Sequence, residues 1–257
     1  MGRCRYLQFP YLSDNYGVLV HDEETGKTAA VDAGDDAAYL AALAEAGLTL
    51  DEIWITHHHW DHTDGLAALK KATGAVVRGP AETKDHIAAH IDLGYQDGDS
   101  FDFAGQTVSV IATPGHTLDM VNFFLTGDEV LFSGDSLFTL GCGRLFEGDG
   151  PMMWDSLQKL RALPTQTVIY GSHEYSLANA KFALSVDPHN TALQHRAAEI
   201  EAKRAKDEPT VPSLLSEELA TNPFLRPDDA GIRQHLGMEA ATDTAVFTQI
   251  RTLKDNF

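Results

Sequence analysis

The chain is short of the residues that would mark a secreted or membrane-embedded protein. It has only two cysteines among 257 residues, Cys4 and Cys142, which are too few for a disulfide framework, and we expect both to be free thiols. No apolar run approaches the ~18 residues that a membrane-spanning helix needs. Residues 1–9 contain no apolar stretch of signal-peptide length. We therefore expect a cytoplasmic protein.

Basic residues are scarce as well. Lysine and arginine number 19 against 38 aspartate and glutamate residues, which gives a formal net charge of −19. A chain of this charge repels nucleic acid and anionic membrane surfaces, so we expect neither as a partner. An anionic substrate would need basic residues gathered locally. The hydrophobic fraction of 43% is that of an ordinary globular protein with a real core.

Apolar runs of strand length dominate the first two thirds of the chain, and helical patterns dominate the rest. We predict strands at 6–10, 17–21, 28–31, 53–55, 75–78, 101–103, 108–111, 121–125, 130–132 and 168–170. Helices are predicted at 37–46, 64–72, 81–90 and 152–162, and then without further strands at 176–186, 191–207, 213–220 and 242–254. These patterns predict an α+β fold, with a domain of residues 1–172 and a smaller, all-helical domain of residues 173–257.

One predicted strand, 53–55, is followed at once by metal-ligand side chains: His57, His59, Asp61 and His62. In extended backbone alternate side chains share a face, so His57 and His59 can reach one point while His58 faces away. Asp61 and His62 lie past the bend and can reach a second, neighbouring point. Imidazole and carboxylate groups are ligands for zinc, iron and manganese.

Four further strand ends lead through small residues to an acid or a histidine: Asp32, His116, Asp135 and His173. Strand ends of a layered α/β protein gather at one edge of the sheets, and binding sites form there. A single histidine of this kind is often structural. Asp32 is either a plain turn residue or an acceptor behind the ligands. Five strand ends that offer metal-type side chains are hard to explain by core packing.

Seven of these side chains are candidate ligands, because Asp32 is set aside. One ion uses three or four protein ligands, so seven predict two ions with a bridging group. The bridge is assigned to Asp135, because a carboxylate has two oxygens, and Asp61 and Asp135 are the candidate catalytic residues. One ion would be held by His57, His59, His116 and Asp135, and the other by Asp61, His62, His173 and Asp135. Two such ions lower the pKa of a bridging water to about 7, and the hydroxide can attack a carbonyl or phosphoryl ester.

The order of Asp32, residues 57–62, His116, Asp135 and His173 resembles the metallo-β-lactamase superfamily, which implies an αββα sandwich. Within that superfamily, three stretches resemble glyoxalase II, the hydroxyacylglutathione hydrolases: 141–148 (GCGRLFEG), 171–175 (GSHEY) and 222–226 (NPFLR). The tail at 251–255 (RTLKD) resembles the thiol-binding end of that family. The resemblance covers nearly the whole chain.

The resemblance implies hydrolysis of S-D-lactoylglutathione to D-lactate and glutathione by a hydroxide that bridges two divalent metal ions, with zinc first. It assigns the glutathione moiety to Arg144, Tyr175, Arg251 and Lys254. Phe146 stands where some members carry a tyrosine, so a phenol hydrogen bond cannot form there. Arg251 and Lys254 are three positions apart, so they project from one helix face. Favourable charges near a helix C-terminus are the alternative explanation for both.

Several questions stay open on the sequence. A glutathione persulfide dioxygenase with a single iron is the nearest alternative function, although it would not need the basic helical tail. Iron and manganese suit histidine and aspartate ligands as zinc does. No sequence feature identifies the residues that contact the acyl group, and none assigns a role to Cys142. We expect a monomer that binds a small-molecule glutathione thioester.

Overall fold

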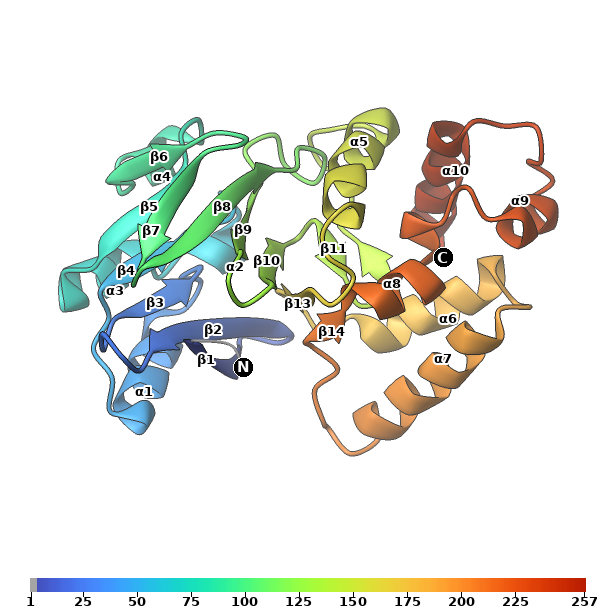
Figure 1. Ribbon diagram of the computed structural model, residues 1–257. Coiled ribbons are helices and arrows are strands. Elements are labelled where there is room, and N and C mark those ends of the chain that lie inside the picture. Colours follow the sequence, from blue (N-terminus) through green and yellow to red (C-terminus); the bar gives the residue numbers. More distant parts are fainter. Residues whose placement is uncertain (1–3) are drawn as a thin grey trace. The chain divides into compact units, whose positions relative to one another are not determined.

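The computed structural model describes residues 4–257, which divide into two compact units (Figure 1). Unit 1 comprises the residues up to 112 together with 119–134, and unit 2 comprises residues 113–118 and 135–257. Strands dominate unit 1, and helices dominate unit 2. No helix within residues 4–257 has the length and hydropathy needed to cross a membrane.

Unit 1 contains two sheets. The first has the order β1-β2-β3-β4-β5-β6, antiparallel from β1 to β3 and parallel from β3 to β6. In the second, β10, β9, β8 and β7 are antiparallel neighbours. The strands are β1 (Cys4–Tyr11), β2 (Asn15–Asp22), β3 (Thr28–Val31), β4 (Glu52–Trp54), β5 (Val76–Pro80), β6 (Leu93–Tyr95), β7 (Ser100–Phe103), β8 (Gln106–Ala112), β9 (Val121–Leu125) and β10 (Val130–Gly134). The helices are α1 (Asp36–Ala46), α2 (Trp60–Thr63), α3 (Leu66–Thr73) and α4 (Asp85–Ala88).

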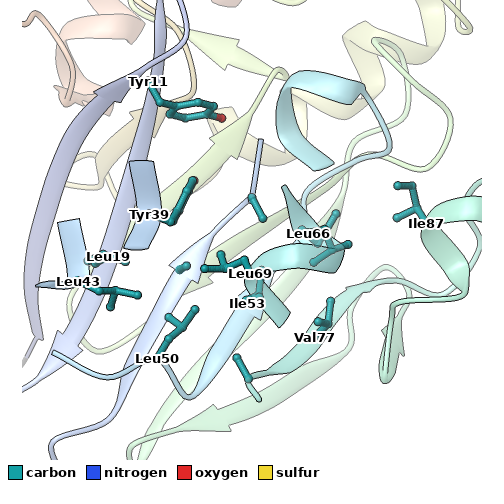
Figure 2. Packing of buried hydrophobic residues seen from close by; sticks show 14 residues of the cluster. Tyr11, Leu19, Tyr39, Leu43, Leu50, Ile53, Leu66, Leu69, Val77 and Ile87 are labelled. Carbon is teal, nitrogen blue, oxygen red and sulfur yellow. The ribbon is translucent and has the colours of Figure 1, made fainter. Parts of the chain in front are cut away.

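Helices α1 and α3 cover one face of the first sheet. Tyr39 and Leu43 of α1 and Leu66 and Leu69 of α3 belong to one buried cluster with Ile53 of β4, and Figure 2 shows these side chains gathered between the helices and the strands. Burying a leucine or isoleucine side chain completely contributes about 1.5–3 kcal/mol. This cluster therefore fixes β4, the strand that leads into residues 57–62, against two helices.

The opposite face of β4 packs on the second sheet, because successive side chains of a strand point to opposite faces. Trp54 is fully buried there, and its ring centroid lies 5.1 Å from that of Phe103 and 5.7 Å from that of Phe123. The indole N–H donates a 2.8 Å hydrogen bond to Glu52, which also accepts from Arg78. The two sheets of unit 1 thus enclose an aromatic layer whose polar groups are paired.

Unit 2 combines two short strand pairs with helices. β11 (Leu137–Phe138) and β12 (Gly141–Cys142) form a hairpin, and β13 (Val168–Gly171) pairs with β14 (Ser213–Leu214). Leu140, at the tip of this hairpin, is buried with side chains of α6 and α7. The helices are α5 (Gly150–Arg161), α6 (Ser176–Val186), α7 (Thr191–Arg204), α8 (Leu215–Thr221), η1 (Pro223–Leu225), α9 (Ala230–Leu236) and α10 (Asp243–Asp255).

Most predicted elements are present with bounds shifted by one or a few residues, and the predicted helix 176–186 is α6. The predicted helix over 81–90 is wrong in extent, because only α4 forms and its N-cap, Lys84, makes no side-chain capping bond. The single turn α2 was not predicted, and neither were β6 and α9. Strands also continue beyond residue 172, since the two residues of β14 pair with β13.

Candidate functional site

Unit 1 carries a group of four side chains that we call the N-terminal ligand cluster: His57, His59, Asp61 and His62. His57 Nε2 lies 3.1 Å from His59 Nδ1, and His62 Nε2 lies 3.4 Å from Asp61 Oδ2. His59 is extended, with φ −60° and ψ 147°, whereas Asp61 and His62 belong to α2. His57 and His62 are fully buried. The change from extended to helical backbone turns successive side chains toward one region.

Asp32 orients His62, a member of the N-terminal ligand cluster, through a hydrogen bond to its ring. It follows β3 with φ 61°, a backbone conformation that aspartate tolerates better than most residues. Its carboxylate accepts hydrogen bonds from Thr56 N at 2.8 Å and from His62 Nδ1 at 2.8 Å. A hydrogen-bonded carboxylate on one ring nitrogen selects the tautomer that leaves the other, Nε2, as an electron-pair donor. This geometry is the one a metal-binding histidine requires.

Two residues that the sequence did not point to hold Asp61. Tyr11 and Asn15 face each other across the first turn of the chain, between β1 and β2. The Tyr11 hydroxyl donates to Asp61 O at 2.9 Å, and Asn15 Nδ2 donates to Asp61 Oδ2 at 3.1 Å. Burial raises the pKa of Tyr11, so its hydroxyl stays protonated and remains a donor. In the sequence, the only signal at these positions is a pair of polar residues beside a turn. That pattern indicates the turn itself and not a contact with Asp61.

His58 lies outside the N-terminal ligand cluster, as its place in the alternating pattern predicts. Its Nδ1 is 2.9 Å from Asp119 Oδ1, and Asp119 Oδ2 accepts a 2.5 Å hydrogen bond from Thr83. His58 therefore has a carboxylate partner of its own. The sequence offered no reason to single out Asp119, which lies between the predicted strands 108–111 and 121–125.

Unit 2 carries a second group, which we call the C-terminal ligand cluster: His116, Asp135 and His173. Asp135 Oδ2 lies 3.2 Å from His116 Nε2, and Asp135 Oδ1 lies 3.3 Å from His173 Nε2. All three residues are more than nine-tenths buried. Each carboxylate oxygen thus faces a different imidazole, which is the arrangement that a carboxylate shared by two metal ions would need.

Backbone groups fix the ring of His116. Its Nδ1 donates to the carbonyl oxygen of Arg144 at 2.7 Å, so Nε2 is again the electron-pair donor. The chain can pass this close because residue 143 is glycine. A Cβ atom at Gly143 would lie 2.0 Å from the carbonyl oxygen of Asp135 and 3.0 Å from His116 Nδ1. The predicted loop 141–148 therefore orients His116, a predicted ligand, directly through its backbone.

The β11–β12 hairpin, which connects Asp135 to Arg144, is held by buried side chains of the helical region. Asn179 donates to Thr139 O at 3.0 Å, and Leu140 N donates to Glu218 at 2.9 Å. The backbone carbonyls of Gly141 and Cys142 accept from side chains of the same region, at 3.0 Å each, and the donors are Asn222 and Arg251. Buried backbone groups need such partners, because leaving one unpaired costs about 1–3 kcal/mol.

Three of the predicted substrate-binding residues lie at the surface of unit 2. Phe146 is 60% exposed, and its ring meets that of His116 edge to face at 5.3 Å. Tyr175 stacks flat on His173, with centroids 4.7 Å apart and planes 2° apart. Arg144 extends its guanidinium to within 6.0 Å of the Phe146 ring centre. These exposed groups are therefore placed beside two members of the C-terminal ligand cluster.

The other two predicted substrate-binding residues occupy less open positions. Arg251 is 5% exposed, and its guanidinium packs 5.0 Å above the ring of Phe224. Lys254 Nζ donates to Ala178 O at 3.2 Å and lies 5.2 Å from the ring centre of Phe182. Burial, and then the charge of Arg251, lower the pKa of Lys254. They lie on one helix, but Arg251 is an interior residue.

The donor set fits divalent metal ions of the zinc, iron and manganese class. It consists of imidazole nitrogens and carboxylate oxygens, and no cysteine side chain belongs to either cluster. Two of the imidazoles, His62 and His116, are oriented by a hydrogen bond to the nitrogen that would face away from an ion. The fold and these histidine and aspartate clusters support binding of divalent metal.

The comparisons with known proteins agree along the whole chain. The family model described as metallo-beta-lactamase superfamily matches residues 14–173, and that described as hydroxyacylglutathione hydrolase C-terminus matches residues 174–257. A hydroxyacylglutathione hydrolase from Ruegeria pomeroyi is 52% identical, over 96% of this chain and 97% of the relative. The chain belongs to the hydroxyacylglutathione hydrolase family. A member from Brucella anthropi is 53% identical, over 99% of this chain and 98% of that protein.

Solved structures place this hydroxyacylglutathione hydrolase family member in the same fold. ETHE1 from Myxococcus xanthus is 25% identical with a TM-score of 0.68, over 97% of this chain and 89% of that chain. TTHA1623 in a di-iron-bound form is 23% identical with a TM-score of 0.60, over 86% and 100%, a likeness that shows the fold alone. The predicted metallo-β-lactamase fold with a helical C-terminal region is therefore confirmed. The relatives of about 50% identity are named hydroxyacylglutathione hydrolases, so they do not favour the alternative function of a persulfide dioxygenase.

Proposed function

We propose that the chain hydrolyses the thioester of S-D-lactoylglutathione and related 2-hydroxyacylglutathiones to D-lactate and glutathione, the second step of methylglyoxal detoxification. The observation that carries the proposal is identity of about 50% to hydroxyacylglutathione hydrolases along nearly the full length of both chains. The proposed reaction requires histidine and aspartate side chains that are held in place by neighbouring groups. Both ligand clusters consist of such side chains.

The proposal includes two divalent metal ions, zinc first, held by both ligand clusters. One ion would take His57, His59, His116 and Asp135, and the other Asp61, His62, His173 and Asp135. When bound, such ions supply an activated water and a Lewis acid for the thioester carbonyl. Asp135 is assigned the bridging position because each of its oxygens faces one imidazole. Asp32 keeps His62 in the tautomer that binds through Nε2.

The remaining roles are assigned to residues of unit 2. Arg144, Phe146 and Tyr175 are proposed to bind the glutathione moiety, because they are exposed next to His116 and His173. Lys254 and Arg251 would add positive charge for its carboxylates. The leaving thiolate has a pKa of about 8.5, so no side chain needs to protonate it, and none is assigned that role.

The experiment combines steady-state hydrolysis of S-D-lactoylglutathione with metal analysis of the same purified protein. We expect hydrolysis and close to two ions per chain, and we expect Asp135→Ala to lose both together. Asp228→Ala, which breaks an exposed ion pair with Arg161, is the matched control and should keep both. Two tightly bound ions in Asp135→Ala would contradict the bridging role. Oxygen consumption with a glutathione persulfide would instead support the dioxygenase.

Three further predictions belong to this proposal. We propose a domain boundary near residue 172, with residues 1–172 as the catalytic domain and 173–257 as the helical glutathione-binding domain. We propose that the protein is a cytoplasmic monomer. Size-exclusion chromatography with light scattering measures the mass of the particle, and a mass of about two chains would contradict the monomer.

A further inference from the structure

Two arginines of unit 2 share one carboxylate oxygen at the end of α10. Arg251 Nη2 donates to Asp255 Oδ1 at 2.8 Å, and Arg144 Nε lies 3.8 Å from the same oxygen. Lys254 follows Arg251 three positions later on the same helix, and its Nζ donates to Ala178 O at 3.2 Å. Two cationic side chains from separate segments therefore meet at a single anionic one, in a chain whose net charge is −19.

The two arginines differ in their access to solvent. The side chain of Arg251 is 6% exposed, and its Nη1 is already bonded to Cys142 O at 3.0 Å. The side chain of Arg144 is 63% exposed, and that of Asp255 is 35% exposed. Asp255 is thus a partly exposed acceptor of the buried arginine, and it lies 3.8 Å from the exposed Arg144.

We propose that Asp255 is an internal counter-ion that competes with a substrate carboxylate for Arg144 and Arg251, and so sets the affinity for glutathione thioesters. The inference rests on the proposed function, because it takes the glutathione moiety as the ligand of these cations. A carboxylate that binds Arg144 displaces an exposed, 3.8 Å ion pair, and such pairs contribute only about 0–1 kcal/mol. The exchange is therefore easily reversible, and its cost appears as a weaker affinity.

Charge crowding at the same place supports this role. Lys254 has a lowered pKa because of burial and, next, because of the positive charge of Arg251. An anion among these cations relieves their mutual repulsion in the absence of ligand. Once the substrate supplies a carboxylate of its own, Asp255 becomes a like charge beside it, and the interaction turns from favourable to unfavourable.

The test is Asp255→Asn, which removes the charge but keeps an amide oxygen that can accept from Arg251. Asp228→Asn is the matched control, because it removes one negative charge from an arginine ion pair of 2.6 Å with Arg161. The measurements are the inhibition constant of glutathione and the KM and kcat for S-D-lactoylglutathione. For Asp255→Asn we expect the inhibition constant and KM to fall roughly twofold to fivefold, with kcat unchanged. Asp228→Asn should leave all three unchanged.

Two controls separate competition from other effects. The gain should shrink in ~1 M salt, where the Debye length is only about 3 Å. It should be absent for the lactoyl thioester of N-acetylcysteamine, which has no carboxylate. A gain that persists with this neutral thioester, or that Asp228→Asn reproduces, would overturn the inference.

An unchanged or raised KM in Asp255→Asn would also overturn it, since Asp255 would then only support Arg251. If this variant fails to fold by circular dichroism, Asp255→Ser provides the same comparison. A wild-type enzyme that neither binds glutathione nor hydrolyses its thioester would instead refute the proposed function. Hydrolysis that is normal in wild type and insensitive to Asp255 would refute the counter-ion alone.

Discussion

The side-chain amide of Asn15 lies 3.1 Å from Oδ2 of Asp61, a predicted metal ligand 46 positions later in the chain. Asn15 is 3% exposed and belongs to β2, so its position is set by the first hairpin rather than by the ligand segment. Because Asn15 belongs to a different segment from Asp61, its hydrogen bond holds the Asp61 carboxylate in one orientation. Asp61 therefore depends on a turn at the start of the described chain for its geometry.

We expect Asn15→Ala to weaken binding of one metal ion about 10–100-fold, the usual effect of losing a group that orients a ligand. Competition with a chelator during zinc loading measures the affinity. Tyr11→Phe should cost less, because it removes a hydrogen bond to the backbone of Asp61 and leaves the carboxylate contact. Unchanged zinc affinity in Asn15→Ala, with Asp61→Ala impaired, would show that Asn15 does not position the ligand.

Gly143 is expected to tolerate no side chain. In Gly143→Ala the new Cβ would meet the Asp135 carbonyl at 2.0 Å, so the backbone beside His116 must move. We expect loss of most metal binding and at least tenfold lower kcat/KM. Gly47→Ala is the control, because its Cβ would meet nothing within 4 Å and only φ 68° is unfavourable, at about 1–2 kcal/mol. Equal metal content in the two variants would contradict the close approach.

Glu218 is expected to be the most sensitive of the residues that hold the β11–β12 hairpin. It is fully buried, pairs with Arg196 and accepts from Leu140 N. In Glu218→Ala the largely buried Arg196 loses its close carboxylate and keeps only Glu217 at 3.9 Å, and Leu140 N loses its acceptor. The free energy of unfolding should therefore fall by about 3–5 kcal/mol. Urea denaturation measures the change. The neighbouring Glu217 has a side chain that is 53% exposed, and Glu217→Ala should cost less than about 1 kcal/mol. Similar losses in the two variants would argue against a special role of Glu218 in holding the hairpin.

Cys142 is expected to be unreactive at neutral pH, although it lies in the predicted loop 141–148. Burial raises its pKa from 9.0 to about 11, against the lowering effect of Arg251. Iodoacetamide at pH 7.5 should therefore label it only after unfolding. Rapid labelling of the native protein at Cys142, located by mass spectrometry, would show that the thiol is accessible.

The raised pKa of Cys142 also predicts that the stability of the folded protein depends on pH. The folded protein binds the Cys142 proton more tightly than the unfolded chain, so this contribution is full below about pH 9 and is lost as pH rises to about 11. The loss is about 2–3 kcal/mol for a shift of this size. The stability difference between wild type and Cys142→Ala, from urea denaturation at several pH values, should decrease across that window. A constant difference would contradict the raised pKa.

The residues that sequence reasoning found are those whose chemistry is unusual in itself. Histidines and aspartates directly after apolar strands were sufficient to name Asp32, residues 57–62, His116, Asp135 and His173 as one set of candidates. Strand periodicity also predicted the strands of unit 1 except β6, and helical spacing predicted helix 176–186. Both signals are local, because they depend on side-chain type and on spacing of a few residues.

The residues that it missed act through tertiary hydrogen bonds. Asn15, Asn179 and Glu218 are ordinary polar residues in turn or helix patterns, and each acquires its role from a partner at least 40 positions away. Arg251 shows the same limit, because helical spacing placed it beside Lys254 but could not show that it is buried. Short elements such as α2 and β14 depend on pairing and packing more than on their own sequence.

The way in which Glu218 and Asn222 hold residues 138–141 has a consequence for the order of events during synthesis. When β12 has just emerged from the ribosome, the nascent chain already contains His116 and Asp135. It still lacks the side chains that bond to the backbone of the β11–β12 hairpin. We therefore expect the carbonyl of Arg144 to settle onto His116 only after α8 has emerged. Tight capture of metal by this half of the enzyme would then be among the last steps of its maturation.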